Sequence, residues 1–180
     1  MGNLLYRLLL TFNATSLIIV IFLIKEKYTI ICLSSLSIYI SYIIFICTPI
    51  VLTGISLLIT RFLSSDSITG EIKDVEQANN AFLPSYLGYF FVALSVPYCE
   101  TLVFIFAILF VFTFLSQTLY FNPLFLFFGY YFYYVTTENN VKLFLISKKQ
   151  IRSSKGLSFP TLKRINNFTY IDKGGKKWII

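Results

Sequence analysis

The side chains that most often perform catalysis are scarce in this sequence. It contains no histidine, which removes the commonest general base, the commonest metal ligand and any Ser-His-Asp or Cys-His arrangement. Three cysteines, Cys32, Cys47 and Cys99, are odd in number, widely spaced and set among apolar residues, so they support neither a disulfide framework nor a CxxC site. We therefore expect no catalytic residues, no metal and no cofactor, and a protein that is not an enzyme.

The charged residues that remain are unevenly distributed. Ten of the fifteen Lys and Arg residues follow residue 140, against the single acid Asp172, and a shorter acidic run lies in residues 64–81. A basic segment can hold anionic membrane lipids, dock a protein partner or bind nucleic acid. Because no signature of a nucleic-acid-binding fold occurs, we expect no direct nucleic-acid contact. The predicted partner-binding residues are Lys148, Lys149, Arg152, Lys155, Lys163, Arg164, Glu71, Asp74 and Glu76.

Two further polar residues stand out because they interrupt an apolar stretch. Residues 82–134 contain one side chain that is charged at neutral pH, Glu100, close to Pro97 and Tyr98, and this local sequence is typical of a tight turn. A charge within the hydrocarbon layer would indicate a functional site, whereas a turn places it in water at the membrane surface. We predict that Tyr98 and Glu100 are exposed on the outer face, where an extracellular event could reach them.

The segments that position these residues are long enough to cross a membrane. With 57% hydrophobic and 13% charged residues, the chain is more apolar than a typical soluble domain. A single helix of residues 82–134 would extend about 80 Å, against a hydrocarbon core of about 30 Å, so it must cross at least twice. With the apolar runs nearer the N-terminus, we predict four transmembrane helices at about residues 4–24, 29–47, 82–99 and 101–121.

The second apolar run, residues 28–60, is longer than one span needs and too short for two. Pro49 lacks an amide donor and disfavours helical geometry at Thr48, so we place the end of the second span before it. Residues 49–63 then continue as a kinked helix or lie in the interface. The second run also carries a stripe of small polar residues, which suits close helix packing or a permeation path: Ser34, Ser35, Ser37 and Ser41.

The polar segments outside these spans give two different patterns. Residues 64–81 predict a short acidic amphipathic helix capped by Thr69, because Ile72 and Val75 share a face with Phe82 at helical spacing. Residues 131–137 and 141–147 are rich in β-branched and aromatic residues and are separated by Glu-Asn-Asn, which predicts a β-hairpin.

We therefore expect an all-α polytopic membrane protein with a small β-containing cytoplasmic cap at its C-terminus. The four-helix transmembrane domain would occupy residues 1–130, and the basic hairpin cap would occupy residues 131–180. Short segments rich in Lys and Arg stay in the cytoplasm, so both termini and residues 64–81 should be cytoplasmic.

The sequence also resembles a known family. It contains four predicted spans and the segment FLPSYLGYFFVALS at residues 82–95. It also contains Asn122-Pro123-Leu124 directly after the last span, and a basic β-type tail. In these features it is similar to KwaA, the membrane subunit of the bacterial Kiwa anti-phage defence system. The resemblance implies a multi-pass protein of the bacterial inner membrane that forms a homo-oligomer, with a tetramer as the expected form. It also implies a cytoplasmic DNA-binding effector, KwaB, as partner, and no catalytic residues.

Two functions from different classes fit these observations. The first is a membrane sensor and scaffold that detects phage attack at the envelope and recruits the effector through residues 64–81 and the basic tail. The alternative is a small oligomeric ion channel or holin-like pore that uses the serine stripe of the second span.

Overall fold

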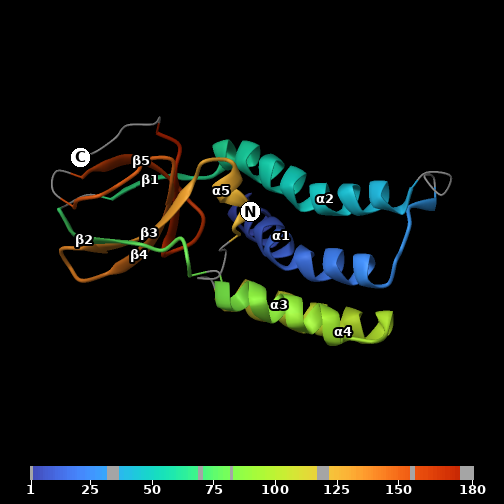
Figure 1. Ribbon diagram of the computed structural model, residues 1–180. Helices are drawn as coiled ribbons and strands as arrows, with labels where there is room; N and C mark the ends of the chain where they lie inside the picture. The colour runs from blue at the N-terminus through green and yellow to red at the C-terminus, as the bar shows by residue number, and fades with distance from the viewer. Residues whose placement is uncertain are drawn as a thin grey trace.

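The protein consists of a layer of apolar helices joined at one end to a β-sheet (Figure 1). The computed structural model describes residues 2–31, 37–68, 71–81, 83–116, 122–154 and 157–174. The helices in this part of the chain are α1 (Gly2–Lys25), α2 (Ile38–Ile59), the 3₁₀ helix η2 (Thr60–Phe62), α3 (Leu83–Ser95), α4 (Cys99–Ser116) and the short α5 (Leu124–Phe127).

Helix α1 is the centre of the helical layer. It contacts α2, α3 and α4. Half of its most apolar segment is buried inside the protein, whereas the buried share is 22% for α2 and 11% for α4. One apolar cluster joins Ile18 and Phe22 of α1 to Tyr86, Ala93 and other residues of the α3–α4 pair. The outer faces of α2 and α4 are instead lined by exposed Ile, Val, Leu and Phe side chains.

Within the described residues, α1, α2 and α4 are long and apolar enough to cross a membrane. Helix α3 has 13 residues, which corresponds to about 20 Å and is shorter than a hydrocarbon core. The predicted helical span near the N-terminus thus corresponds to α1, and the described part of the span at residues 101–121 corresponds to α4, since residues 117–121 lie outside the described residues. The third predicted span contains the shorter α3.

Helix α2 corrects the prediction for the second span. It begins at Ile38 rather than near residue 29 and continues through Pro49 to Ile59. Pro49 has no amide hydrogen to donate to the preceding turn of the helix. In that turn the Thr48 hydroxyl donates to the Ile44 carbonyl oxygen at 2.9 Å. Because a backbone in apolar surroundings must satisfy its own hydrogen bonds, continuing the helix past the proline costs less than unwinding it.

A mixed sheet forms the other part of the molecule. Its described strands lie in the order β1-β5-β6-β4-β3-β2, with β4 and β6 parallel and all other neighbours antiparallel. Their bounds are β1 (Ser65–Ile68), β2 (Ile72–Gln77), β3 (Tyr131–Thr137), β4 (Lys142–Ser147), β5 (Phe159–Arg164) and β6 (Thr169–Asp172).

This sheet makes the expected fold class wrong, because an all-α protein with a small cap would not contain six paired strands. The predicted hairpin is present as β3 and β4, and Asn140 in its turn has a φ of 58°. The predicted acidic helix is not formed. The connector between α2 and α3, which we define as residues 64–81, instead forms β1 at one edge of the sheet and β2 at the other, and Thr69 and Phe82 lie outside the described residues.

The connector is extended because pairing with the sheet outweighs its weak helical pattern. Ile72 is buried and Val75 half-buried against the apolar core on one side of the sheet, and both are β-branched. This core also contains Phe159 and Leu162 of β5, so the two halves of the sheet curve toward each other around it (Figure 1).

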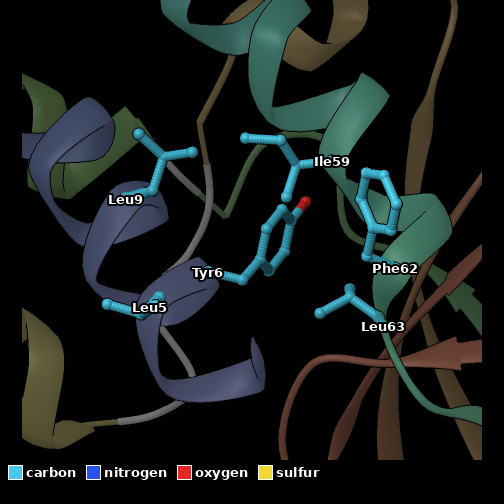
Figure 2. A pocket seen from close by; sticks show the side chains of 6 residues that line it. All are labelled: Leu5, Tyr6, Leu9, Ile59, Phe62 and Leu63. Carbon is cyan, nitrogen blue, oxygen red and sulfur yellow. The ribbon is translucent and has the colours of Figure 1, made fainter. Parts of the chain in front are cut away.

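The opposite face of the sheet packs against the helices. Phe132, Phe144 and Ile146 of the central strands form one cluster with Tyr6 and Leu10 of α1. Figure 2 shows Tyr6 lying between α1 and the end of α2, with Ile59, Phe62 and Leu63 around it. The helices and the sheet therefore share a continuous apolar core at their junction.

Phe132 tests this junction. Its ring is fully buried and stacks on Phe144 with 5.7 Å between ring centroids. Phe132→Ala should lower the free energy of unfolding by about 3–5 kcal/mol, because it replaces the ring with a cavity. Denaturant unfolding of the detergent-solubilised protein, followed by circular dichroism, measures this change.

The control substitution is Phe168→Ala, since the Phe168 side chain is 48% exposed. It should change stability by only about 0.5 kcal/mol. Equal effects of the two substitutions would contradict the packing of the sheet on the helices.

Candidate functional site

The predicted outer-face residues lie together at the helix ends farthest from the sheet. Lys25, at the end of α1, donates from Nζ to the Val96 carbonyl oxygen at 2.6 Å and pairs with Glu26 at 3.2 Å. A cation at this position also stabilises the C-terminal end of α3. The bond fixes the turn between α3 and α4, which carries Tyr98, 70% exposed, and leads to the exposed Glu100 in the first turn of α4.

A buried polar network connects three segments inside the helical layer. Asn13 of α1, Thr53 of α2 and Asn122, just before α5, are all buried, and Asn122 Nδ2 lies 3.2 Å from Thr53 Oγ1. The Asn13 amide satisfies its surroundings best with its oxygen facing Asn122 Nδ2 at 2.9 Å and its nitrogen facing the Pro49 carbonyl oxygen at 3.2 Å. In an apolar layer such bonds hold helices in one register.

The serine stripe is only partly described. Ser41 is buried and its Oγ accepts a hydrogen bond from the Ile30 amide at 3.3 Å, while Ser37 is exposed before the first turn of α2. Ser34 and Ser35 lie outside the described residues. The buried polar side chains of α2, namely Ser41, Thr53 and Ser56, thus belong to packing within this chain.

The acidic residues of the predicted partner surface lie along one edge of the sheet. Glu71 precedes β2, and Asp74 and Glu76 lie on it; all three side chains are exposed. Glu76 pairs with Lys142 of β4 at 3.0 Å, whereas neither Glu71 nor Asp74 forms an ion pair within the described residues. These carboxylates are available on the free edge of β2.

The basic residues do not share that surface. Lys163 and Arg164 lie on β5, near the opposite edge of the sheet. Lys163 Nζ donates to the Leu63 carbonyl oxygen and to Ser65 Oγ, both at 2.9 Å, so it fastens the end of η2 to the sheet. Arg164 Nη2 donates to Asn167 Oδ1 at 2.6 Å, and Asn3 Nδ2 donates to the Arg164 carbonyl oxygen at 3.1 Å.

The basic residues that follow β4 differ in their burial and in their contacts. Lys149 Nζ lies 3.0 Å from Asp172 Oδ2, and the exposed fractions of these side chains are 16% and 3%. Ser147 Oγ also donates to Asp172 Oδ2, at 3.1 Å, so this carboxylate is satisfied inside the protein. Lys148 is half-buried and Arg152 is exposed, while Lys155 lies outside the described residues.

Sequence reasoning missed several residues of the junction and the polar network. Asn13 and Asn122 interrupt apolar runs, a pattern that could have indicated interhelical hydrogen bonds. Arg61 and Lys173 lie close enough to influence one another, and this proximity depends on the return of β6 to the end of α2. No local pattern predicts it. The part of the chain that the structure describes holds no group of three or more potential metal ligands.

The family of the chain follows from a comparison with known families. A family model described as "Anti-phage protein KwaA" matches residues 6–171. The chain belongs to the KwaA family of anti-phage proteins. The match begins in α1 and ends in β6, so the helices and the curved sheet form one family unit. No curated protein and no solved structure gives a match.

The Lys149–Asp172 pair provides a test of the site's internal electrostatics. Lys149→Met should lower the free energy of unfolding by about 3–5 kcal/mol, because it leaves the Asp172 carboxylate buried without its cation. Thermal unfolding of the detergent-solubilised protein at neutral pH measures the loss.

Lys142→Met is the matched control. It removes the same group from the Lys142–Glu76 pair, whose side chains are 55% and 63% exposed, and should cost less than about 1 kcal/mol. If the two variants lose the same free energy of unfolding, Lys149 has no structural role. The prediction that it belongs to the partner-binding surface then stands.

Proposed function

We propose that this KwaA-family protein is a non-catalytic sensor and scaffold of the bacterial inner membrane. Its helices lie in the bilayer and its sheet lies in the cytoplasm, where it recruits a DNA-binding effector subunit, KwaB. Phage attack at the envelope acts on the helix ends around Tyr98 and Glu100. The absence of histidine from the sequence supports a role without catalysis.

Two features support the placement of the helices in the membrane. Three of them are long and apolar enough to span it, and exposed tyrosines lie at one end of the helical layer, as at a membrane–water interface. These are Tyr28, Tyr39 and Tyr98, at the end away from the sheet. The basic residues Arg61, Lys148 and Lys173 near the sheet end favour a cytoplasmic sheet.

The observation that carries the proposal is the position of the connector. Helix α2 leads into β1 at one edge of the sheet, and β2 at the other edge leads into α3. A displacement of α2 relative to α3 therefore acts on opposite edges of one curved sheet. This arrangement suits a protein that converts an event at the membrane into a change on its cytoplasmic surface.

The exposed faces of α2 and α4 support self-association. Both carry rows of large apolar side chains that no other described part of the chain covers, including Ile43, Val51, Phe104 and Phe112. Lipid or another copy of the chain can cover such faces. We propose a homo-oligomer that contacts through one of these faces.

The acidic edge at β2 is the proposed docking surface for the effector. β2 begins at the end of the sheet away from the helices and runs toward α3, so a bulky cytoplasmic partner can reach its first residues (Figure 1). The exposed carboxylates of Glu71 and Asp74 are not engaged in ion pairs among the described residues. A partner with a complementary basic surface would be guided to this edge.

Charge reversal tests this surface. The double variant Glu71→Lys with Asp74→Lys should weaken effector binding by more than about tenfold, because it replaces attraction with repulsion. Co-purification of the effector from solubilised membranes measures binding, and membrane fractionation confirms insertion.

The comparison variant is Arg152→Glu, which reverses an exposed charge of the basic segment. It should retain the effector. Loss of the effector with Arg152→Glu but not with the β2-edge variant would place docking on the basic segment and refute the proposed surface.

A further inference from the structure

A groove lies between the end of α2 and the sheet. Its volume is about 490 Å³, which is within the range of roughly 300–1,000 Å³ for ligand pockets. Its apolar lining comes from Gly54, Leu57 and Leu58 of α2 and from Phe128 and Tyr130 after α5. The remaining lining residues are two lysines, Lys148 and Lys173. The groove thus combines an apolar wall with cationic side chains.

Gly54 and Phe128 shape the apolar wall. A Cβ atom on Gly54 would lie 3.3 Å from Phe128 Cζ, so the glycine lets the aromatic ring approach α2 closely. A larger side chain at this position would displace the ring or fill the groove.

The groove lies at the height where an apolar helix meets water. Gly54, Leu57 and Leu58 belong to the last two turns of α2, whose apolar segment ends at Phe62. Leu58 is 68% exposed although it is apolar, which is expected for a side chain that contacts lipid. An acyl chain can therefore enter the groove directly from the bilayer.

The lysines give this position a positive charge that no carboxylate of the described residues neutralises. Lys148 Nζ lies 4.9 Å from the centroid of the Tyr130 ring, and neither Lys148 nor Lys173 forms an ion pair among the described residues. The nearby Asp172 carboxylate is engaged by Lys149. Partial burial, with Lys163 and Arg61 nearby, lowers the pKa of Lys173. An anion beside Lys173 would offset its repulsion from these two cations.

We propose that this groove is a specific binding site for an anionic phospholipid of the cytoplasmic leaflet. One acyl chain lies along Leu57, Leu58 and Phe128, and the phosphate is bound between Lys148 and Lys173. The proposal rests on the membrane placement given under the proposed function, and it assigns a lipid class to one site.

Native mass spectrometry of the full-length protein in detergent tests this site. The probes are dioleoylphosphatidylglycerol and dioleoylphosphatidylcholine, which share their acyl chains and differ in net charge. The wild-type protein should retain about tenfold more of the anionic lipid. Lys148→Glu with Lys173→Glu should reduce its retention to that of phosphatidylcholine, and Gly54→Leu should reduce retention of both lipids.

The matched control is Lys73→Glu with Lys142→Glu, which makes the same change of charge on β2 and β4 and should leave retention unchanged. Gel filtration and circular dichroism identify variants that fail to fold, and Lys148→Gln with Lys173→Gln then provides a milder pair that should also lose the preference. Equal retention of the two lipids by the wild-type protein would overturn the proposal. Full displacement by glycerol 3-phosphate, which has no acyl chains, would also overturn it.

Membrane fractionation separates this proposal from the proposed function. A wild-type protein that inserts into membranes but shows no preference for the anionic lipid refutes the site alone. A wild-type protein that does not insert refutes the membrane placement on which both proposals depend.

Discussion

The connector forms both edge strands of the sheet, and this is the constraint on which the rest of the structure depends. Three residues separate Ile68 at the end of β1 from Ile72 at the start of β2, so their Cα atoms are at most about 14 Å apart. In a flat sheet of six strands the edges would be roughly 24 Å apart. The sheet must therefore curve, and its curvature encloses the core around Phe159 and Leu162.

The junction between helices and sheet follows from the same constraint. Because the connector begins after η2 and ends at α3, the sheet lies directly against the ends of the helices. Lys163 of the sheet and Asn3 and Tyr6 of α1 make contacts that join the two parts there. The polar network of Asn13, Thr53 and Asn122 holds α1 and α2 in register below this junction. A change in helix packing would reach the sheet through these contacts rather than through a flexible linker.

The sequence predicted the parts of the fold that local patterns determine. The apolar run of α1, the turn around Pro97 and the hairpin with Asn140 in its turn follow from hydrophobic length, proline and the positive φ that asparagine tolerates. The connector could not be predicted, because Ile72 and Val75 fit one face of a helix as well as a strand, and only their distant partners on β3 decide between the two. The prediction that the second span ends before Pro49 was wrong for a related reason. The apolar surroundings of α2 outweigh the local preference of proline to end a helix.

The candidate site was predictable as a set of charges but not as a surface. Lys149 and Arg152 are neighbours in a basic run, yet Lys149 is half-buried beside Asp172 and Arg152 is exposed, and this difference depends on the return of β6 beside β4. The acidic residues lie close together because Asp74 and Glu76 are on one short strand and Glu71 directly precedes it. Their separation from the basic residues reflects the order of strands in the sheet, which no local pattern encodes.

Cross-linking of the two sheet edges in living cells tests the central claim most directly. Ser67→Cys on β1 and Lys73→Cys on β2, in a chain whose native cysteines are replaced by serine, would be treated with a cell-permeant bismaleimide before and after phage addition. The account predicts that phage changes the yield of the cross-link and that Tyr98→Ala with Glu100→Ala abolishes the change. A Thr136→Cys, Lys142→Cys pair, which joins register partners of β3 and β4, should not respond. An edge-to-edge yield that phage does not alter, in cells where the protein still protects, would contradict the account.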